Sequence, residues 1–212
     1  TLGDNVIRTL NAAQSEPVTM RRIEFVGPSV GEELKEDGGL AMLVALIGIL
    51  LYVTMRFEWR LSVGAVASLA HDVILTLGLF SLLGLEFDLT VLAAILALIG
   101  YSINDTIVVF DRIRESFRKL RDASVAETIN EAITSTLNRT VITSLTTVLV
   151  LLVLFYLGGA LIHGFATALL FGIAVGTYSS IYVASALAEL LGLSREDMLS
   201  PPVETEGADP QP

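Results

Sequence analysis

Five long apolar segments, separated by short polar connections, dominate this sequence. They cover residues 39–55, 61–83, 89–110, 140–157 and 165–191. A helix needs about 20 residues to cross the hydrocarbon core of a bilayer, and flanking residues extend the two shortest segments toward that length. None of the segments has the polar face that a helix in a soluble bundle requires. The sequence therefore predicts an all-α integral membrane protein with a five-helix transmembrane domain over residues 39–191.

Composition supports a membrane protein and narrows the possible chemistry. Hydrophobic residues make up 53% of the chain and charged residues 17%, whereas soluble domains average about 25% charged residues. The absence of cysteine from the sequence excludes disulfides, thiol nucleophiles and cysteine-based metal sites. The two histidines have no matching carboxylate cluster, so neither a metal nor another cofactor is expected.

The two ends of the chain differ from its apolar part. Residues 4–13 have helical spacing, and residues 20–26 alternate like a strand before Gly27-Pro28 interrupts the pattern. We interpret residues 1–38 as the C-terminal remnant of an extracytoplasmic α+β domain, with an unstructured leader as the alternative. Residues 192–212 are rich in proline and acidic residues, which predicts a disordered acidic tail.

The lysines and arginines predict the orientation in the membrane. None lies between Leu61 and Asp111 or between Thr140 and Ser194, and they gather in the remaining connections. By the positive-inside rule those connections are cytoplasmic, which places residues 1–38 outside and the C-terminus in the cytoplasm. Within one cytoplasmic connection, residues 124–137 have apolar residues at helical spacing. They predict an amphipathic helix on the membrane surface or on a neighbour, or else a solvated connector.

Asp105 is the strongest candidate for a functional residue. An aspartate at the centre of a membrane helix costs about 2.5–3.5 kcal/mol on insertion scales, so such a residue is a functional-site hypothesis by default. Arg139 begins the fourth segment, and antiparallel helices would bring it to a similar depth. An arginine that approaches or leaves the aspartate would release or load a proton. A static salt bridge that fixes helix packing is the alternative.

Other polar residues near the segments are secondary candidates. His71 and Asp72 lie at the centre of the second segment, where they could extend a proton path or hydrogen-bond a neighbouring helix. Asn104 precedes Asp105, and Asp111 follows at the membrane exit, where an interfacial ion pair with an arginine is expected. The sequence has no Gly-rich phosphate loop, catalytic triad pattern or zinc-protease motif. We therefore do not expect an enzyme.

Several motifs resemble those of the SecD/SecF family of bacterial protein-export membrane proteins, and of its SecF branch in particular. They are residues 26–34 (VGPSVGEEL), 51–60 (LYVTMRFEWR), 71–72 (HD), 100–108 (GYSINDTIV), 110–115 (FDRIRE) and 138–140 (NRT). The resemblance covers residues 20–190. It implies a relationship to the resistance-nodulation-division transporters, and an architecture of one helix, an extracytoplasmic α+β domain and five more helices. The chain would then be a fragment, or the C-terminal piece of a fused SecD–SecF polypeptide.

The resemblance also implies a function. A multi-pass subunit of this kind in the bacterial inner membrane uses the proton-motive force, with SecD, to drive late steps of preprotein translocation through the SecY channel. Asp105 matches the family's intramembrane aspartate, and Arg139 matches its partner arginine.

The expected partners follow from the same resemblance. They are SecD, the SecYEG channel, the translocating preprotein and the lipid bilayer, with YajC and YidC as further candidates and no nucleic acid. One alternative function is a proton-coupled exporter of small solutes or lipids in the same superfamily. Another is a structural subunit in which the Asp105–Arg139 pair is a static lock.

Overall fold

The computed structural model describes residues 2–13 and 28–198, and regular structure within these ranges is helical throughout. Five of the described helical runs are long and apolar enough to cross a membrane. The helices are α1 (Leu2–Ala13), α2 (Pro28–Arg56), α3 (Trp59–Leu83), α4 (Leu89–Lys119), α5 (Val125–Leu157), α6 (Ala160–Tyr178), a π-helical turn η1 (Ser179–Val183), α7 (Ala184–Leu190) and α8 (Arg195–Met198). The predicted all-α class with five spans is therefore confirmed. The strand predicted for residues 20–26 lies outside the described residues.

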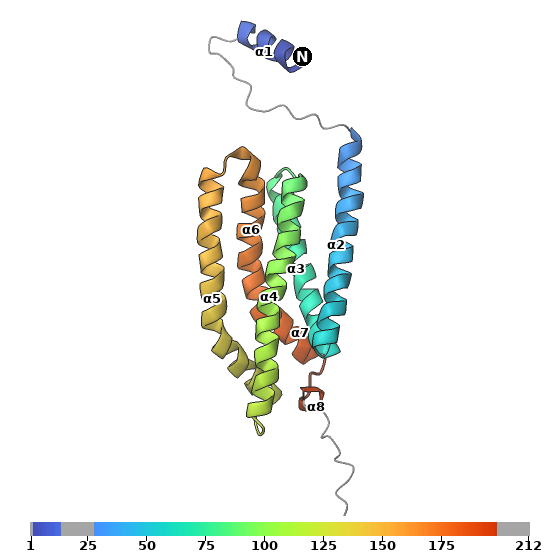
Figure 1. Ribbon diagram of the computed structural model, residues 1–212, viewed down its shortest axis with the longest axis vertical. Coiled ribbons are helices and arrows are strands. Elements are labelled where there is room, and N and C mark those ends of the chain that lie inside the picture. The colour runs from blue at the N-terminus through green and yellow to red at the C-terminus, as the bar shows by residue number, and fades with distance from the viewer. Residues whose placement is uncertain (1, 14–27, 199–212) are drawn as a thin grey trace, which may run out of the picture. The chain divides into compact units, whose positions relative to one another are not determined.

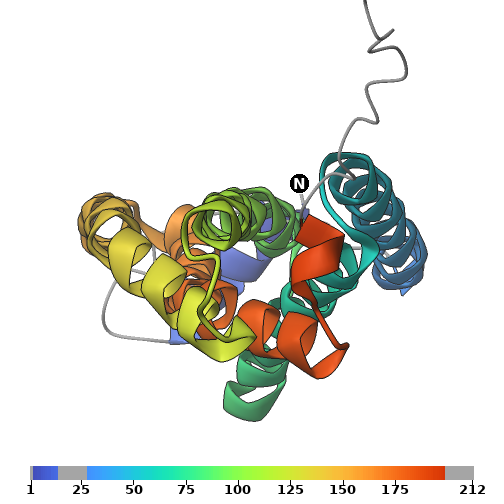
Figure 2. The ribbon, with the colours of Figure 1, turned by 90° about the horizontal axis from the view of Figure 1, so that it is seen from below.

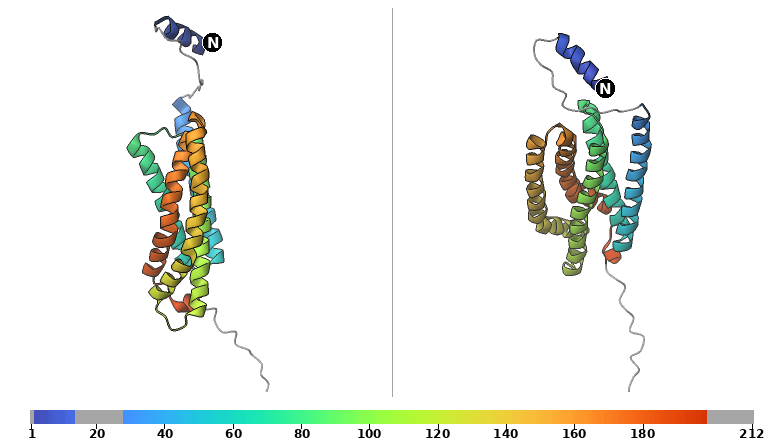
Figure 3. Two further views of the ribbon diagram at one scale, coloured as in Figure 1. Left: turned by 90° about the vertical axis from the view of Figure 1, so that its left-hand side faces the viewer. Right: turned by 45° about the horizontal axis from the view of Figure 1, so that its top comes forward.

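The chain divides into two compact units at Gly39–Leu40, and the second unit contains the membrane bundle. In this bundle α4 packs against α3, α5 and α6, while α6, η1 and α7 form one continuous helical run (Figure 1). The far end of α3 leans away from its neighbours (Figure 3), and Leu82 and Leu83 are exposed there. The central position of α4 explains why a polar side chain on its inward face is removed from lipid.

Local signals at the helix ends keep successive helices antiparallel. Gly84 ends α3 with φ of 62°, and the Leu85 amide donates to the Phe80 carbonyl at 2.9 Å. A left-handed residue at this position suits glycine, because it has no side chain to clash. Asp88 then caps α4, accepting hydrogen bonds from the amides of Thr90 and Val91, both at 2.9 Å. The turn between α3 and α4 can therefore be short.

At the opposite end of the bundle, α4 and α5 both extend beyond their apolar parts. We call this end, which carries Arg56, Arg60 and Arg112, the basic end. A capping box between Ser124 and Glu127 begins α5, which continues to Leu157. The predicted amphipathic helix over residues 124–137 is thus the first part of the fourth span. It turns across the basic end toward α4 (Figures 1 and 2) and packs against this neighbour.

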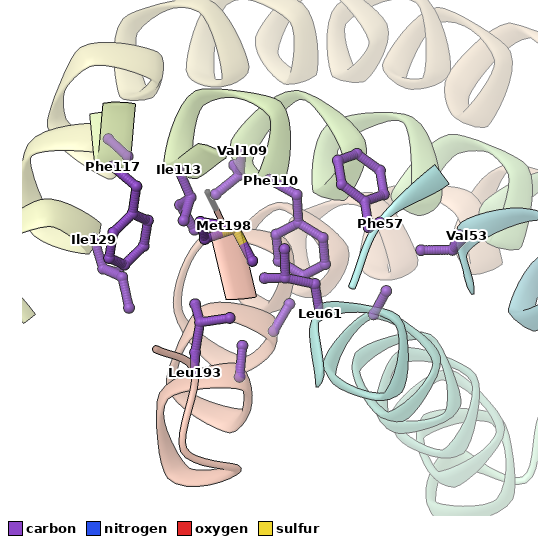
Figure 4. Close-up of a cluster of buried hydrophobic side chains, with 14 residues drawn as sticks. Val53, Phe57, Leu61, Val109, Phe110, Ile113, Phe117, Ile129, Leu193 and Met198 are labelled. Carbon is purple, nitrogen blue, oxygen red and sulfur yellow. The ribbon is translucent and has the colours of Figure 1, made fainter. Parts of the chain in front are cut away.

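The segment from Leu193 to Met198 corrects the prediction of a disordered tail beginning at residue 192. Leu193 and Met198 are buried in the apolar cluster at the basic end, beside Phe110, Ile113 and Phe117 (Figure 4). Burial of these two apolar side chains stabilises residues 193–198 against the bundle. The prediction missed this because it used the average composition of the whole tail, which is polar. We call residues 193–198 the C-terminal latch. Residues 199–212, the rest of the predicted tail, lie outside the described residues.

Two arginines hold the C-terminal latch to the bundle. The Arg195 guanidinium donates to the carbonyl oxygens of Leu120 at 2.7 Å and Ala123 at 2.9 Å, just beyond the end of α4. A cation at a helix C-terminus also complements the helix dipole. From α3, Arg60 forms an ion pair with Asp197 at 2.5 Å. The latch therefore joins the C-terminal part of the chain to α3 and α4.

The latch should loosen in acid. The Ser194 side chain and amide hydrogen-bond Asp197, and with Arg60 they hold the pKa of this carboxyl below its usual range. Because the folded pKa is depressed, the stabilisation is present above the ordinary aspartate value of about 3.9 and is lost as the pH falls through the folded pKa. We expect amide hydrogen exchange in the latch, corrected for intrinsic rates, to accelerate over that range. Asp197→Asn should remove this pH dependence; an unchanged profile in the variant would contradict the assignment.

Close packing of α3 on α7 depends on Gly64. A Cβ atom there would lie 2.7 Å from the Ala184 carbonyl oxygen, whereas a Cβ at Gly78 on the same helix would meet nothing within 4 Å. We expect Gly64→Ala to lower the stability by about 1–3 kcal/mol, because the two backbones must separate. Gly78→Ala should be neutral or slightly stabilising, since alanine favours a helix. Thermal unfolding in detergent tests this contrast, and equal shifts in Tm for the two variants would refute it.

Candidate functional site

Asp105 lies on the inward face of α4, within the bundle. Its exposed fraction is only 4%. Among the described residues its Oδ2 atom is one of three buried side-chain atoms without a hydrogen-bond partner. Buried polar atoms are normally paired, and an unpaired one requires an explanation in terms of function or of a group that is not yet bound. The structure therefore marks Asp105 as a buried carboxyl group with an unsatisfied oxygen on α4.

Arg139 lies on the neighbouring antiparallel helix α5. Its charge is close enough to act electrostatically on Asp105, but within the described ranges neither a hydrogen bond nor a direct ion pair joins the two side chains. Arg139 is exposed rather than buried. The structure thus places the two predicted residues on neighbouring helices without joining their side chains directly.

A pocket of about 440 Å³ opens beside Arg139, between α4 and α5 at the basic end. Its lining is mostly polar and comprises Val108, Asp111, Arg112, Glu115, Ser135, Thr136 and Arg139. Val108 is one helical turn from Asp105 along α4. The pocket therefore reaches the level of Arg139, and Asp105 itself is not among its lining residues.

The charged residues around the pocket are mostly paired with one another. Both carboxylate oxygens of Asp111 accept from one nitrogen of Arg56, Nη2, at 3.1 Å each. Glu115 pairs with Arg112 and Lys119, each at 2.6 Å. Both partners of the Asp111 pair are nearly half exposed, so this ion pair contributes at most about 1 kcal/mol. The structure thus places Asp111 in a surface ion pair and does not bring it to Asp105.

The other secondary candidates are the exposed Asn104 and the neighbours His71 and Asp72, of which only Asp72 is buried. Asn104 is exposed on α4, so it does not join Asp105 in the interior. Asp72 is 1% exposed, and its Oδ2 accepts a hydrogen bond from the Ser102 hydroxyl at 2.8 Å. His71 Nδ1 lies 3.2 Å from Asp72 Oδ1, while 38% of the His71 side chain is exposed. His71 and Asp72 therefore differ in exposure, although their side chains remain in contact.

Ser180, in the π-helical turn η1, was missed by sequence reasoning. Thr106 donates a hydrogen bond to its hydroxyl at 3.0 Å, and Ser180 itself donates to the Ser102 carbonyl at 3.2 Å. The consecutive serines at 179 and 180 were the only signal in the sequence, and it was a weak one. A π turn shifts the helical register by one residue, so regular 3.6-residue spacing does not predict which serine faces α4.

Comparison with known proteins identifies the family. The family model described as "Protein export membrane protein SecD/SecF, C-terminal" matches residues 6–194. The chain belongs to the SecD/SecF family. The resemblance based on the motifs is therefore confirmed.

Two curated members of the SecD/SecF family show how much of a whole protein the chain represents. It is 63% identical over 209 residues to the protein translocase subunit SecF of Vibrio alginolyticus, covering 99% of this chain and 66% of that protein. It is 53% identical over 208 residues to SecF of Escherichia coli O157:H7, covering 98% and 64% respectively. The chain thus spans about two thirds of the length of these relatives.

Solved structures agree with the fold. The chain matches the crystal structure of SecDF from Thermus thermophilus with a TM-score of 0.74 and 53% identity, over 78% of this chain and 23% of that one. A structure of SecDF in a super-membrane-facing form matches with a TM-score of 0.77 and 48% identity, over 90% and 26%. Some relatives carry the joint name SecDF. They support the interpretation that a chain of this kind can be part of a fused SecD–SecF polypeptide.

Proposed function

We propose that this chain is the membrane part of a SecF-like subunit of the bacterial protein translocase. With SecD it uses the proton-motive force to drive late steps of preprotein translocation through the SecY channel, and it performs no covalent chemistry. The observation that carries the proposal is Asp105, a buried carboxyl group with an unpaired oxygen in a chain that belongs to the SecD/SecF family.

The proposed coupling depends on the distance between Asp105 and Arg139. A nearby guanidinium stabilises a carboxylate, and its withdrawal into the pocket favours a protonated carboxyl group. The unpaired Oδ2 can receive either a proton or a hydrogen bond from the arginine. Uptake and release of a proton would therefore be linked to movement of α5 relative to α4, which is a route from proton flow to mechanical work.

The pocket supports a direction for this proton exchange. By the positive-inside rule the basic end is cytoplasmic, so the pocket beside Arg139 faces the cytoplasm. Protons released from Asp105 would leave through it. The same rule places the C-terminal latch in the cytoplasm and residues 1–38 outside, in a multi-pass protein of the bacterial inner membrane.

The proposed partners rest on different kinds of support. SecD is supported by relatives in which SecD and SecF share a name. Family membership is the only support for the other protein partners, which are SecYEG, the preprotein, YajC and YidC. Contact with the lipid bilayer is supported by the exposed apolar faces of α2 and α5. These faces include Leu43, Ile47, Leu51, Leu145, Leu149 and Val153.

An exchange of the two charges distinguishes a proton relay from a static lock. The double variant Asp105→Arg, Arg139→Asp preserves an attractive pair but moves the carboxyl group onto the exposed helix position. If the pair only fixes packing, the exchange should restore export relative to either single variant. We expect no restoration, since the relay requires the carboxyl group on α4. Restored export in the double variant would refute the relay.

A further inference from the structure

A second carboxyl group is buried in the bundle, away from the Asp105–Arg139 pair. Asp72 of α3 lies where α3, α4 and the α6–η1 run meet. A Cβ atom added at Gly176 of α6 would lie 3.4 Å from its Oδ2. Its side chain is as buried as the apolar core. Burial of a charged group is costly unless it is paired, so this residue needs a physical explanation of its own.

A series of hydroxyl groups leads from Asp72 to the neighbour of Asp105. Ser102 donates to Asp72 Oδ2 at 2.8 Å, and its oxygen lies 3.4 Å from the Ser180 hydroxyl. Thr106 in turn donates to Ser180 at 3.0 Å. Thr106 directly follows Asp105 in α4, and Ser102 precedes Asp105 by three residues. The hydroxyls therefore connect the level of Asp72 with the level of Asp105 inside the bundle.

Few charges surround Asp72. On its own helix the neighbour is His71, and on α4 the nearest acidic residue in sequence to Ser102 is Asp105. The α6–α7 run from Phe165 to Ala188 contains no lysine, arginine, histidine or acidic residue, and its two tyrosines, Tyr178 and Tyr182, are exposed. No lysine or arginine forms a hydrogen bond or ion pair with Asp72 among the described contacts. Among these contacts, its one partner that can carry a positive charge is His71, whose Nδ1 lies 3.2 Å from Oδ1, and the opposite oxygen, Oδ2, is bonded only to a hydroxyl.

Hydroxyl partners suit a group that changes its protonation state. A serine hydroxyl can donate to a carboxylate and can equally accept from a carboxylic acid. The hydrogen bond that Ser102 donates to Oδ2 satisfies the ionised form of Asp72, and either of the Ser102 and Ser180 hydroxyls, 3.4 Å apart, can be the donor between them. Rotation of the same hydroxyls satisfies the protonated form, so Oδ2 of Asp72 keeps a partner in both states.

We propose that Asp72 is a second proton-binding carboxyl group, linked through the hydroxyls of Ser102, Ser180 and Thr106 to the level of Asp105. When Asp72 loses its proton, Ser102 accepts it and passes its own proton to Ser180, which passes one to Thr106. Thr106 passes its own proton to the ionised carboxylate of Asp105, the adjacent residue, whose Oδ2 has no other partner among the described residues. Each hydroxyl gains and loses one proton and is unchanged, while Asp72 becomes a carboxylate and Asp105 becomes a carboxylic acid. The inference rests on the proposed proton coupling but concerns a different residue.

Infrared difference spectroscopy between acidic and alkaline pH tests the proposal. The sample is the full-length subunit with SecD in lipid vesicles, as wild type, Asp72→Asn and Asp105→Asn. We expect Asp72→Asn to lose one carboxylic acid C=O stretching band that wild type gains as the pH falls, and Asp105→Asn to retain that band. Asp122→Asn, at an exposed position in the α4–α5 connection, is the matched control and should retain it as well.

A second variant protects the test against misfolding of Asp72→Asn. Ser102→Ala keeps both carboxyl groups and removes the hydrogen bond to Asp72, so we expect the Asp72 band to shift in frequency and in pH midpoint. If Asp72→Asn folds and its difference spectrum matches wild type, the band does not come from Asp72 and the proposal is wrong. If Asp72→Asn does not fold, an unshifted spectrum in Ser102→Ala overturns it. Failure of proton coupling itself would be detected separately, as gradient-dependent export that survives in Asp105→Asn.

Discussion

Asp105→Asn is expected to abolish the part of precursor export that depends on the proton gradient, while the subunit still assembles in the membrane. Asparagine has nearly the same shape as aspartate, so the packing of α4 should persist. It cannot bind and release a proton, so a relay through this position stops. The measurement is pulse-labelled precursor processing in cells whose only copy of the full-length subunit carries the substitution, at matched abundance.

The control for this prediction is Asp122→Asn, the same chemical change at an exposed position. It should export at the wild-type rate. Wild-type export by Asp105→Asn would contradict the role that we assign to the carboxyl group. Loss of the subunit from the membrane would instead show that Asp105 is needed for folding.

Arg139→Ala should cause a loss of similar size. Without the guanidinium, no charge on α5 at this position responds to the state of Asp105, and proton binding is no longer linked to the movement of α5. Arg139→Lys should also be impaired, because an ammonium group is a point charge that cannot form the planar, two-pronged contact of a guanidinium with a carboxylate. The same export assay, with Arg121→Ala as a control at an exposed position, measures both variants.

The comparison between lysine and alanine at position 139 separates two roles. Full activity of Arg139→Lys would mean that positive charge alone is sufficient, and the geometry of the guanidinium would be irrelevant. Full activity of Arg139→Ala would show that Arg139 has no role in the coupling.

The spans could be predicted from the sequence because hydrophobic burial in lipid requires long apolar runs. Their full lengths could not be predicted in this way. The polar parts of α4 and α5 are stabilised by packing and capping at the basic end, although the Ser124–Glu127 pair is a recognisable capping signal. The C-terminal latch was missed because Leu193 and Met198 find their partners, Phe110 and Phe117, only in the tertiary structure.

The candidate site, like the fold, could be predicted from the sequence only in part. Asp105 and Arg139 were identified from the cost of a charge in an apolar helix and from the antiparallel order of the spans. Asp72 was recognised as a polar residue, but its bond to Ser102 was not predicted. Ser180, which contacts Ser102 and Thr106, was missed because it lies in the irregular register of η1. Patterns of regular helical spacing do not predict contacts made at such a turn.

The most direct test of proton coupling is precursor translocation into inverted membrane vesicles, with wild-type and Asp105→Asn subunits at equal abundance. Each preparation is assayed with and without an imposed proton gradient. We predict that the gradient accelerates translocation in wild-type vesicles and has no effect in the variant. An equal response in both would contradict the account, because Asp105 would then be a structural residue and not part of the path that couples protons to export.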